Sequence, residues 1–135
     1  MVEMDLVYEG NLRCQATHLP SGATIATDAP KDNQGQGAAF SPTDLVATAW
    51  GACALTLMGI YARRHNLALE GTRARVLKDM TTSAPRRIGK LTLVVTIPTP
   101  VPAEHRQALE AAAQACPVNK SLHPDVQTTM QFVYG

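Results

Sequence analysis

The chain has 135 residues, a length typical of one domain that buries a single modest core. Charged residues make up 17% of it and the net charge is +1, so no strong overall field would attract nucleic acid or anionic lipid. We therefore expect one domain over residues 1–135, with small molecules or a second copy of the chain as its partners.

The location predicted for this chain is cytoplasmic. No apolar run approaches the roughly 18 residues that a membrane span needs. The first ten residues, "MVEMDLVYEG", lack the basic and apolar regions of a signal peptide. We expect no membrane association.

The first part of the chain has the pattern of three short antiparallel strands. Residues 6–8 and 12–17 flank Gly10 and Asn11, two residue types that tolerate the positive φ of a hairpin turn. A second turn, "LPSG", precedes a third strand over residues 23–28. Residues 29–40 are rich in glycine and polar side chains, which predicts an exposed connection.

A long helix is predicted from about residue 42 to residue 65. Ser41 is placed to be its N-cap and Pro42 its first helical residue. Asp44 follows the cap by three positions, which predicts a variant of the capping box.

This helix is apolar on nearly every face, and such a helix must be enclosed on all sides. One small domain can hardly enclose it alone. The small residues Ala47, Gly51 and Gly59 would let another backbone come close. We therefore expect the helix to lie at the centre of an obligate homodimer.

The rest of the chain alternates strands and helices. Strands are predicted within residues 70–80 and 87–97, and the second of these alternates apolar and polar side chains. A helix over about residues 103–115, a short helix after Pro117 and a closing strand over residues 126–134 follow. The order βββ, α, ββ, α, β predicts an α+β fold with long helices on an antiparallel sheet.

The three cysteines are too few and too far apart for a disulfide scaffold. Cys116 precedes Pro117 and is predicted to be the N-cap of the short helix, where backbone N–H groups would lower the thiol pKa. Cys53 lies inside the long helix, where burial alone would raise its pKa, so it would need a cation from elsewhere in the fold to react. Both also fit the alternative of a small buried side chain, and Cys14 is most simply a packing residue.

Two segments carry a resemblance to a known family. "SPTDLVATAWGACALTLMGIYARR" followed at long range by "AAQACPVNKSLHPDV" resembles the OsmC and organic hydroperoxide resistance (Ohr) superfamily. The resemblance is close over residues 41–135 and loose over the N-terminal hairpins. It implies an OsmC-like fold, in which an antiparallel sheet packs on a long buried central helix within an intertwined homodimer.

The resemblance also implies a thiol-dependent peroxidase of the oxidative stress response. Cys53 would attack an organic hydroperoxide, with hydrogen peroxide as a second candidate, and become a sulfenic acid. Cys116 would then condense with it as a disulfide that a dithiol reductant resets. No cofactor is expected, and the four scattered histidines give no support to a metal site.

An arginine assists the reactive cysteine in that family, and three residues compete for this role. Arg13, just past the first turn, is the best match, and Arg86 and Arg87 are its rivals. An acidic residue ten positions before the reactive cysteine pairs with this arginine in the hydroperoxide branches.

This chain has Thr43 at that acidic position and Asp44 one place later. Asp44 would then either cap the helix or form a salt bridge with the arginine. This departure keeps a second function open, namely a redox-sensing or ligand-binding OsmC-like dimer without significant turnover.

Overall fold

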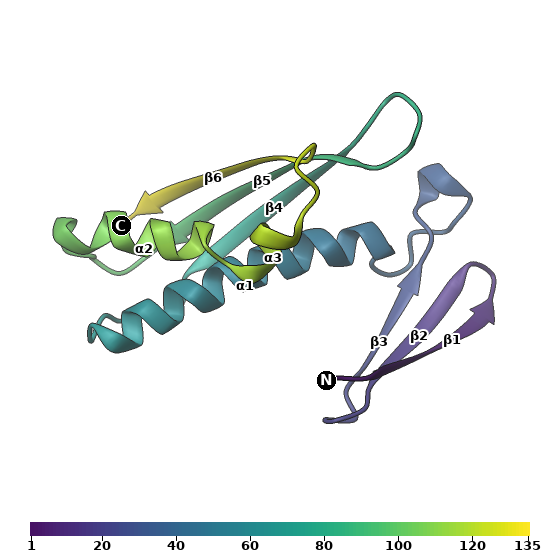
Figure 1. The fold of residues 1–135 in the computed structure, drawn as a ribbon, viewed down its shortest axis with the longest axis horizontal. Helices are drawn as coiled ribbons and strands as arrows, with labels where there is room; N and C mark the ends of the chain where they lie inside the picture. Colours follow the sequence, from purple (N-terminus) through teal and green to yellow (C-terminus); the bar gives the residue numbers. More distant parts are fainter. The chain divides into compact units, whose positions relative to one another are not determined.

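The computed structural model describes all residues from 1 to 135, and the chain divides into two compact units, Met1–Val46 and Ala47–Gly135. The elements follow one another in the predicted order βββ, α, ββ, α, β, with a short third helix before the last strand (Figure 1). The α+β class is therefore confirmed, while the single domain over residues 1–135 stays a prediction.

The N-terminal unit contains a three-stranded antiparallel sheet in the order β1 (Met4–Gly10), β2 (Arg13–His18), β3 (Thr24–Asp28). The first turn forms where it was predicted, because Gly10 and Asn11 adopt φ values of 86° and 55°. Residues 29–40 then form a mostly exposed connection that includes a single turn of 3₁₀ helix, Lys31–Asn33.

The long helix α1 (Pro42–Arg64) begins with the predicted capping box. The backbone N–H of Asp44 donates to Ser41 Oγ at 3.1 Å, and the backbone N–H of Ser41 donates to an Asp44 carboxylate oxygen at 2.9 Å. These two bonds satisfy donors that the first helical turn would otherwise leave without partners.

Within one chain, α1 buries a single stripe and is not enclosed on all sides as the sequence suggested. The buried residues of α1 are Ala47, Trp50, Gly51, Ala54, Met58 and Ala62. Gly51 allows a close approach inside the chain itself, because a Cβ at this position would lie 2.7 Å from Val76 Cγ2. Gly59 is different, since a Cβ there would have no neighbour within 4 Å.

By length and composition alone, α1 could cross a membrane, which corrects the expectation that no segment approaches this limit. An 18-residue window of α1 has a mean hydropathy of 1.6. One third of that window is buried inside the chain. A core helix of a soluble protein meets the same criteria, so the composition of α1 is weak evidence for a membrane span.

The C-terminal unit contains a second three-stranded sheet in the order β4 (Arg73–Met80), β5 (Ile88–Ile97), β6 (Gln127–Tyr134). Strands β4 and β5 are antiparallel as expected, but β6 pairs with β5 in parallel. The reason is the helical connection formed by α2 (Ala103–Gln114) and α3 (Pro117–Ser121), which returns the chain to the end where β5 began.

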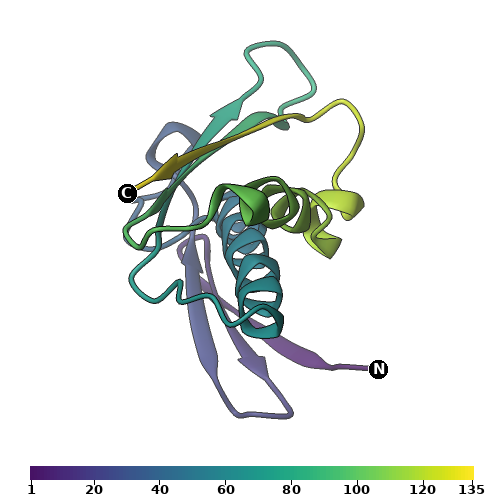
Figure 2. The same cartoon turned by 90° about the vertical axis from the view of Figure 1, so that its left-hand side faces the viewer.

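The core of this unit lies between the sheet and its helices, which cover one face of β4, β5 and β6 (Figures 1 and 2). Strand β5 is central and turns Leu91, Leu93, Val95 and Ile97 inward, as its alternating pattern predicted. These side chains pack in one buried cluster that also contains residues of α1 and α2. Cys116 belongs to the same cluster.

Candidate thiol site

Cys53 and Cys116 meet in the core of the C-terminal unit. Cys53 lies in α1 and is partly buried against the core cluster, whereas Cys116 is 0% exposed and is the N-cap residue of α3. The side chain of Cys53 lies close enough to that of Cys116 to raise the pKa of Cys116. Both are free thiols. The fold thus brings together the two sulfur atoms that lie far apart in the sequence.

The pKa of Cys116 is raised above its usual value, although the sequence predicted that its cap position would lower it. Burial of the thiol has the largest effect. The backbone N–H of Asn119, 3.3 Å from Cys116 Sγ, lowers the pKa, but the neighbouring Cys53 raises it. At neutral pH Cys116 is therefore a thiol that holds its proton.

The two cysteines differ in their exposure to solvent. Cys116 is fully buried, whereas Cys53 keeps part of its surface accessible. A solute can therefore approach Cys53 more readily than Cys116. The S–H of Cys116 would donate a hydrogen bond to a Cys53 thiolate. The charge of that thiolate would disfavour a second negative charge on Cys116.

Asn119 connects the α3 end of this site to α1. Its Oδ1 accepts a hydrogen bond from Trp50 Nε1 at 2.9 Å, and its Nδ2 donates to the Gln114 carbonyl oxygen at 2.8 Å. Its backbone N–H is the one that donates to Cys116 Sγ. The sequence analysis missed this arrangement, because no pattern in the sequence pairs Trp50 with Asn119.

Arg86 and Arg87 lie in the loop between β4 and β5. Arg87 donates to the carbonyl oxygens of Ile88, at 3.0 Å, and Asp125, at 3.5 Å. Arg86 is exposed in the same loop. Neither of the Arg87 contacts involves a cysteine, so an action of Arg87 on Cys53 stays a prediction.

Arg13 and Asp44 belong to the N-terminal unit. Arg13 is exposed on β2, opposite Asp28 of β3. Asp44 forms the helix cap, and its second predicted role, a salt bridge with the assisting arginine, stays a prediction like the role of Arg13 itself. Cys14 is half-buried on β2 opposite Tyr8 and Thr27, and its role as a packing residue stays a prediction.

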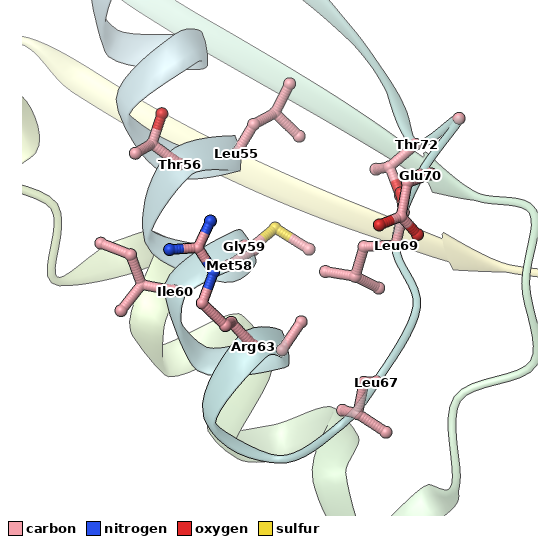
Figure 3. A pocket seen from close by; sticks show the side chains of 12 residues that line it. Leu55, Thr56, Met58, Gly59, Ile60, Arg63, Leu67, Leu69, Glu70 and Thr72 are labelled. Atoms are coloured by element: carbon pink, nitrogen blue, oxygen red, sulfur yellow. The ribbon is translucent and has the colours of Figure 1, made fainter.

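A cavity of about 700 Å³ in the C-terminal unit is not lined by Cys53. It lies between the second half of α1 and residues 67–72, and Leu55, Met58, Ile60, Leu67 and Leu69 give it an apolar lining (Figure 3). Arg63 and Glu70 supply its charged groups. Trp50 is fully buried and lines no part of this cavity.

These features define a small α+β protein with a pair of free cysteines in contact at its centre. The family model described as OsmC-like protein matches residues 35–131. The chain therefore belongs to the OsmC-like family. No curated protein matches it.

Solved structures similar to this chain agree with the family assignment. A protein of Psychrobacter arcticus 273-4, provisionally named an osmotic stress induced and detoxification response protein, is 41% identical, with a TM-score of 0.93 over 98% of this chain and 96% of that one. An organic hydroperoxide resistance protein OsmC of Legionella pneumophila shares the fold at 17% identity, with a TM-score of 0.77 over 98% and 96% of the two chains. An organic hydroperoxide resistance protein of Elizabethkingia anophelis does so at 16% identity, with a TM-score of 0.77 over 100% and 96%.

Proposed function

We propose that this OsmC-like protein is a thiol-dependent peroxidase that reduces organic hydroperoxides, with Cys53 as the reacting cysteine and Cys116 as the resolving cysteine. The observation that supports this most directly is that the two side chains interact, since Cys53 raises the pKa of Cys116. The difference in their burial supports the assignment of the two roles. The peroxide must reach the Cys53 sulfur, whereas the Cys116 sulfur needs to be reached only by Cys53.

The reaction takes one oxidation step at Cys53 and one condensation step that releases water. The Cys53 thiolate attacks one peroxide oxygen, the O–O bond breaks, and the alkoxide that leaves takes up a proton and becomes an alcohol. Cys53 is now a sulfenic acid. The Cys116 sulfur attacks the Cys53 sulfur, the S–O bond breaks, and water leaves with the proton that Cys116 carried.

The disulfide must then be reduced before a second turnover. A dithiol reductant attacks it and leaves as a disulfide of its own, which returns both cysteines to thiols. The raised pKa of Cys116 suits the resolving role, because a thiol that holds its proton can stabilise a neighbouring thiolate and can later supply the proton for water.

The peroxidase would work as an obligate homodimer. In one chain Val46 and Ile60 of α1 remain 38% and 42% exposed, and Leu6, Val7 and Ile25 of the N-terminal sheet remain more than half exposed. Exposed apolar surface on a central helix and on a small sheet is stabilised by packing against another protein surface. We assign a second copy of the chain as this packing partner. A partner subunit could also bring an arginine to Cys53.

A redox-sensing or ligand-binding dimer is the second candidate function. It is favoured by one observation, which is that the guanidinium of Arg87 is engaged by two carbonyl oxygens away from the thiol pair. A Cys53 without a nearby cation would be oxidised slowly and would turn over little.

Steady consumption of cumene hydroperoxide in the presence of a dithiol tests the proposal. A peroxidase consumes many equivalents of peroxide per chain, and Cys53→Ser abolishes this consumption. The matched control is Cys14→Ser, which removes a half-buried cysteine of the other unit and should leave the rate unchanged. A single stoichiometric burst in the wild-type protein would contradict the peroxidase and favour the sensor.

A further inference from the structure

We infer that Trp50 and Asn119 are positioning residues that hold the resolving cysteine against Cys53. This inference rests on the proposed function for its role in turnover, but the thiol pair itself can be tested without any peroxide. Trp50 lies one helical turn before Cys53 in α1, and Asn119 lies in the first turn of α3 after Cys116. The hydrogen bond between their side chains therefore joins the two segments that carry the cysteines.

Helix α3 is too short to hold its own position. This helix has only five residues, Pro117–Ser121, which is far too short to be stable by itself. Its position depends on its contacts with the rest of the unit. Trp50 Nε1 donates to Asn119 Oδ1 at 2.9 Å, and this is a side-chain bond from α3 to α1.

Asn119 makes three hydrogen bonds at once. Its side chain binds Trp50 and the Gln114 carbonyl oxygen, and its backbone N–H donates to Cys116 Sγ. A shift of Asn119 would therefore move the cap of the helix and the sulfur that this cap holds. The indole is fully buried, so losing its acceptor would leave an unpaired N–H in the core.

Disulfide formation depends on how often the two sulfurs are in contact. Holding α3 in place raises the effective concentration of Cys116 at Cys53, and releasing it lowers that concentration. One net hydrogen bond changes such an equilibrium by about tenfold. We expect this change in the formation of the Cys53–Cys116 disulfide and no change in the attack of Cys53 on peroxide.

The test uses the exchange of the thiol pair with oxidised glutathione, in which two protein thiols form one disulfide and two reduced glutathione molecules are released. The equilibrium ratio of disulfide to dithiol protein, at known concentrations of oxidised and reduced glutathione, gives the effective concentration of the two protein thiols. Trp50→Phe keeps an aromatic ring but removes the donor, and we expect it to lower the effective concentration about tenfold. Asn119→Leu removes the acceptor and also the Nδ2 donor to the Gln114 carbonyl oxygen, and should lower the effective concentration at least as much.

Two further variants separate positioning from general loss of structure. Asn119→Asp keeps an oxygen that can accept from Trp50 Nε1 but, like Asn119→Leu, loses the donor to the Gln114 carbonyl oxygen, so we expect an effective concentration between those of Asn119→Leu and the wild type. Ser121→Ala removes a bond of 2.8 Å from Ser121 Oγ to the Pro117 carbonyl oxygen, which lies wholly within α3, and should have no effect. If Trp50→Phe does not fold, Asn119→Leu and Asn119→Asp still give the comparison, because Asn119 is only partly buried.

The outcomes distinguish this inference from the proposed function. If the wild-type protein consumes no peroxide but the two variants show the expected loss in the glutathione exchange, the peroxidase is refuted and the positioning role is kept. An effective concentration that stays the same or rises in both Trp50→Phe and Asn119→Leu would overturn the inference, whatever the peroxide assay gives. In an active protein, Trp50→Phe should also prolong the life of the Cys53 sulfenic acid, measured by trapping with dimedone.

Discussion

Asn119 donates its backbone N–H to Cys116 Sγ at 3.3 Å, yet the pKa of this thiol is raised. A cap bond of this kind stabilises the thiolate, but burial of the sulfur and the adjacent Cys53 stabilise the thiol more. The short helix therefore positions the cysteine, while burial and Cys53 keep its proton in place. Four predictions follow from this site and from the helix that carries Cys53.

The raised pKa of Cys116 predicts how stability depends on pH. The folded protein holds the Cys116 proton to a higher pH than the unfolded chain does, so the contribution is fully present below the usual thiol pKa near 9. It is lost as the pH rises through the folded value. We expect wild-type protein to lose more stability than Cys116→Ser between neutral pH and about pH 10, measured by urea unfolding. Equal losses of stability in the wild type and in Cys116→Ser would contradict a raised pKa of Cys116.

Replacing the resolving cysteine should stop turnover after one step. In Cys116→Ser, Cys53 can still attack the peroxide, but its sulfenic acid has no thiol partner. We expect a burst of about one equivalent of peroxide per chain, a dimedone adduct on Cys53 and no steady rate with a dithiol. Full steady turnover in this variant would show that another thiol resolves the sulfenic acid.

The candidate roles of Arg13 and Arg87 at Cys53 can be separated by comparing two variants. Arg87 is held by the carbonyl oxygens of Ile88 and Asp125, so Arg87→Ala should change the peroxide rate little. If Arg13 stabilises the developing charge, Arg13→Ala should lower kcat/KM about a hundredfold. The initial rate at low peroxide concentration measures both. The reverse result would assign the role to Arg87.

Gly51 and Gly59 form a matched pair on α1. A methyl group at Gly51 would lie 2.7 Å from Val76 Cγ2, and overpacking of this kind costs about 1 to 3 kcal/mol. We expect Gly51→Ala to lower the free energy of unfolding despite the gain of about 1 kcal/mol in helix propensity. An unfolding midpoint at or above that of the wild type would contradict this contact.

Gly59→Ala is the control, because nothing in its own chain lies within 4 Å of the added methyl group. In an isolated chain it should stabilise α1. If the second copy covers this part of the helix, Gly59→Ala will instead weaken the dimer, and sedimentation at decreasing protein concentration will detect this.

The sequence by itself determined the features that depend on a few neighbouring residues. Ser41, Pro42 and Asp44 predict the start of α1 because a helix cap is built from residues within one turn. The alternation of β5 predicts its inward face for the same local reason. Cys116 as the N-cap of α3 follows from the proline beside it.

The tertiary structure decided what depends on residues far apart in the chain. Desolvation set the direction of the Cys116 pKa, and burial is a property of the whole core that a cap motif does not contain. The helical connection made β6 parallel to β5, and folding brought Asn119 to Trp50. The contact between Cys53 and Cys116 has the same origin, because two distant segments become neighbours only when they pack against a common core.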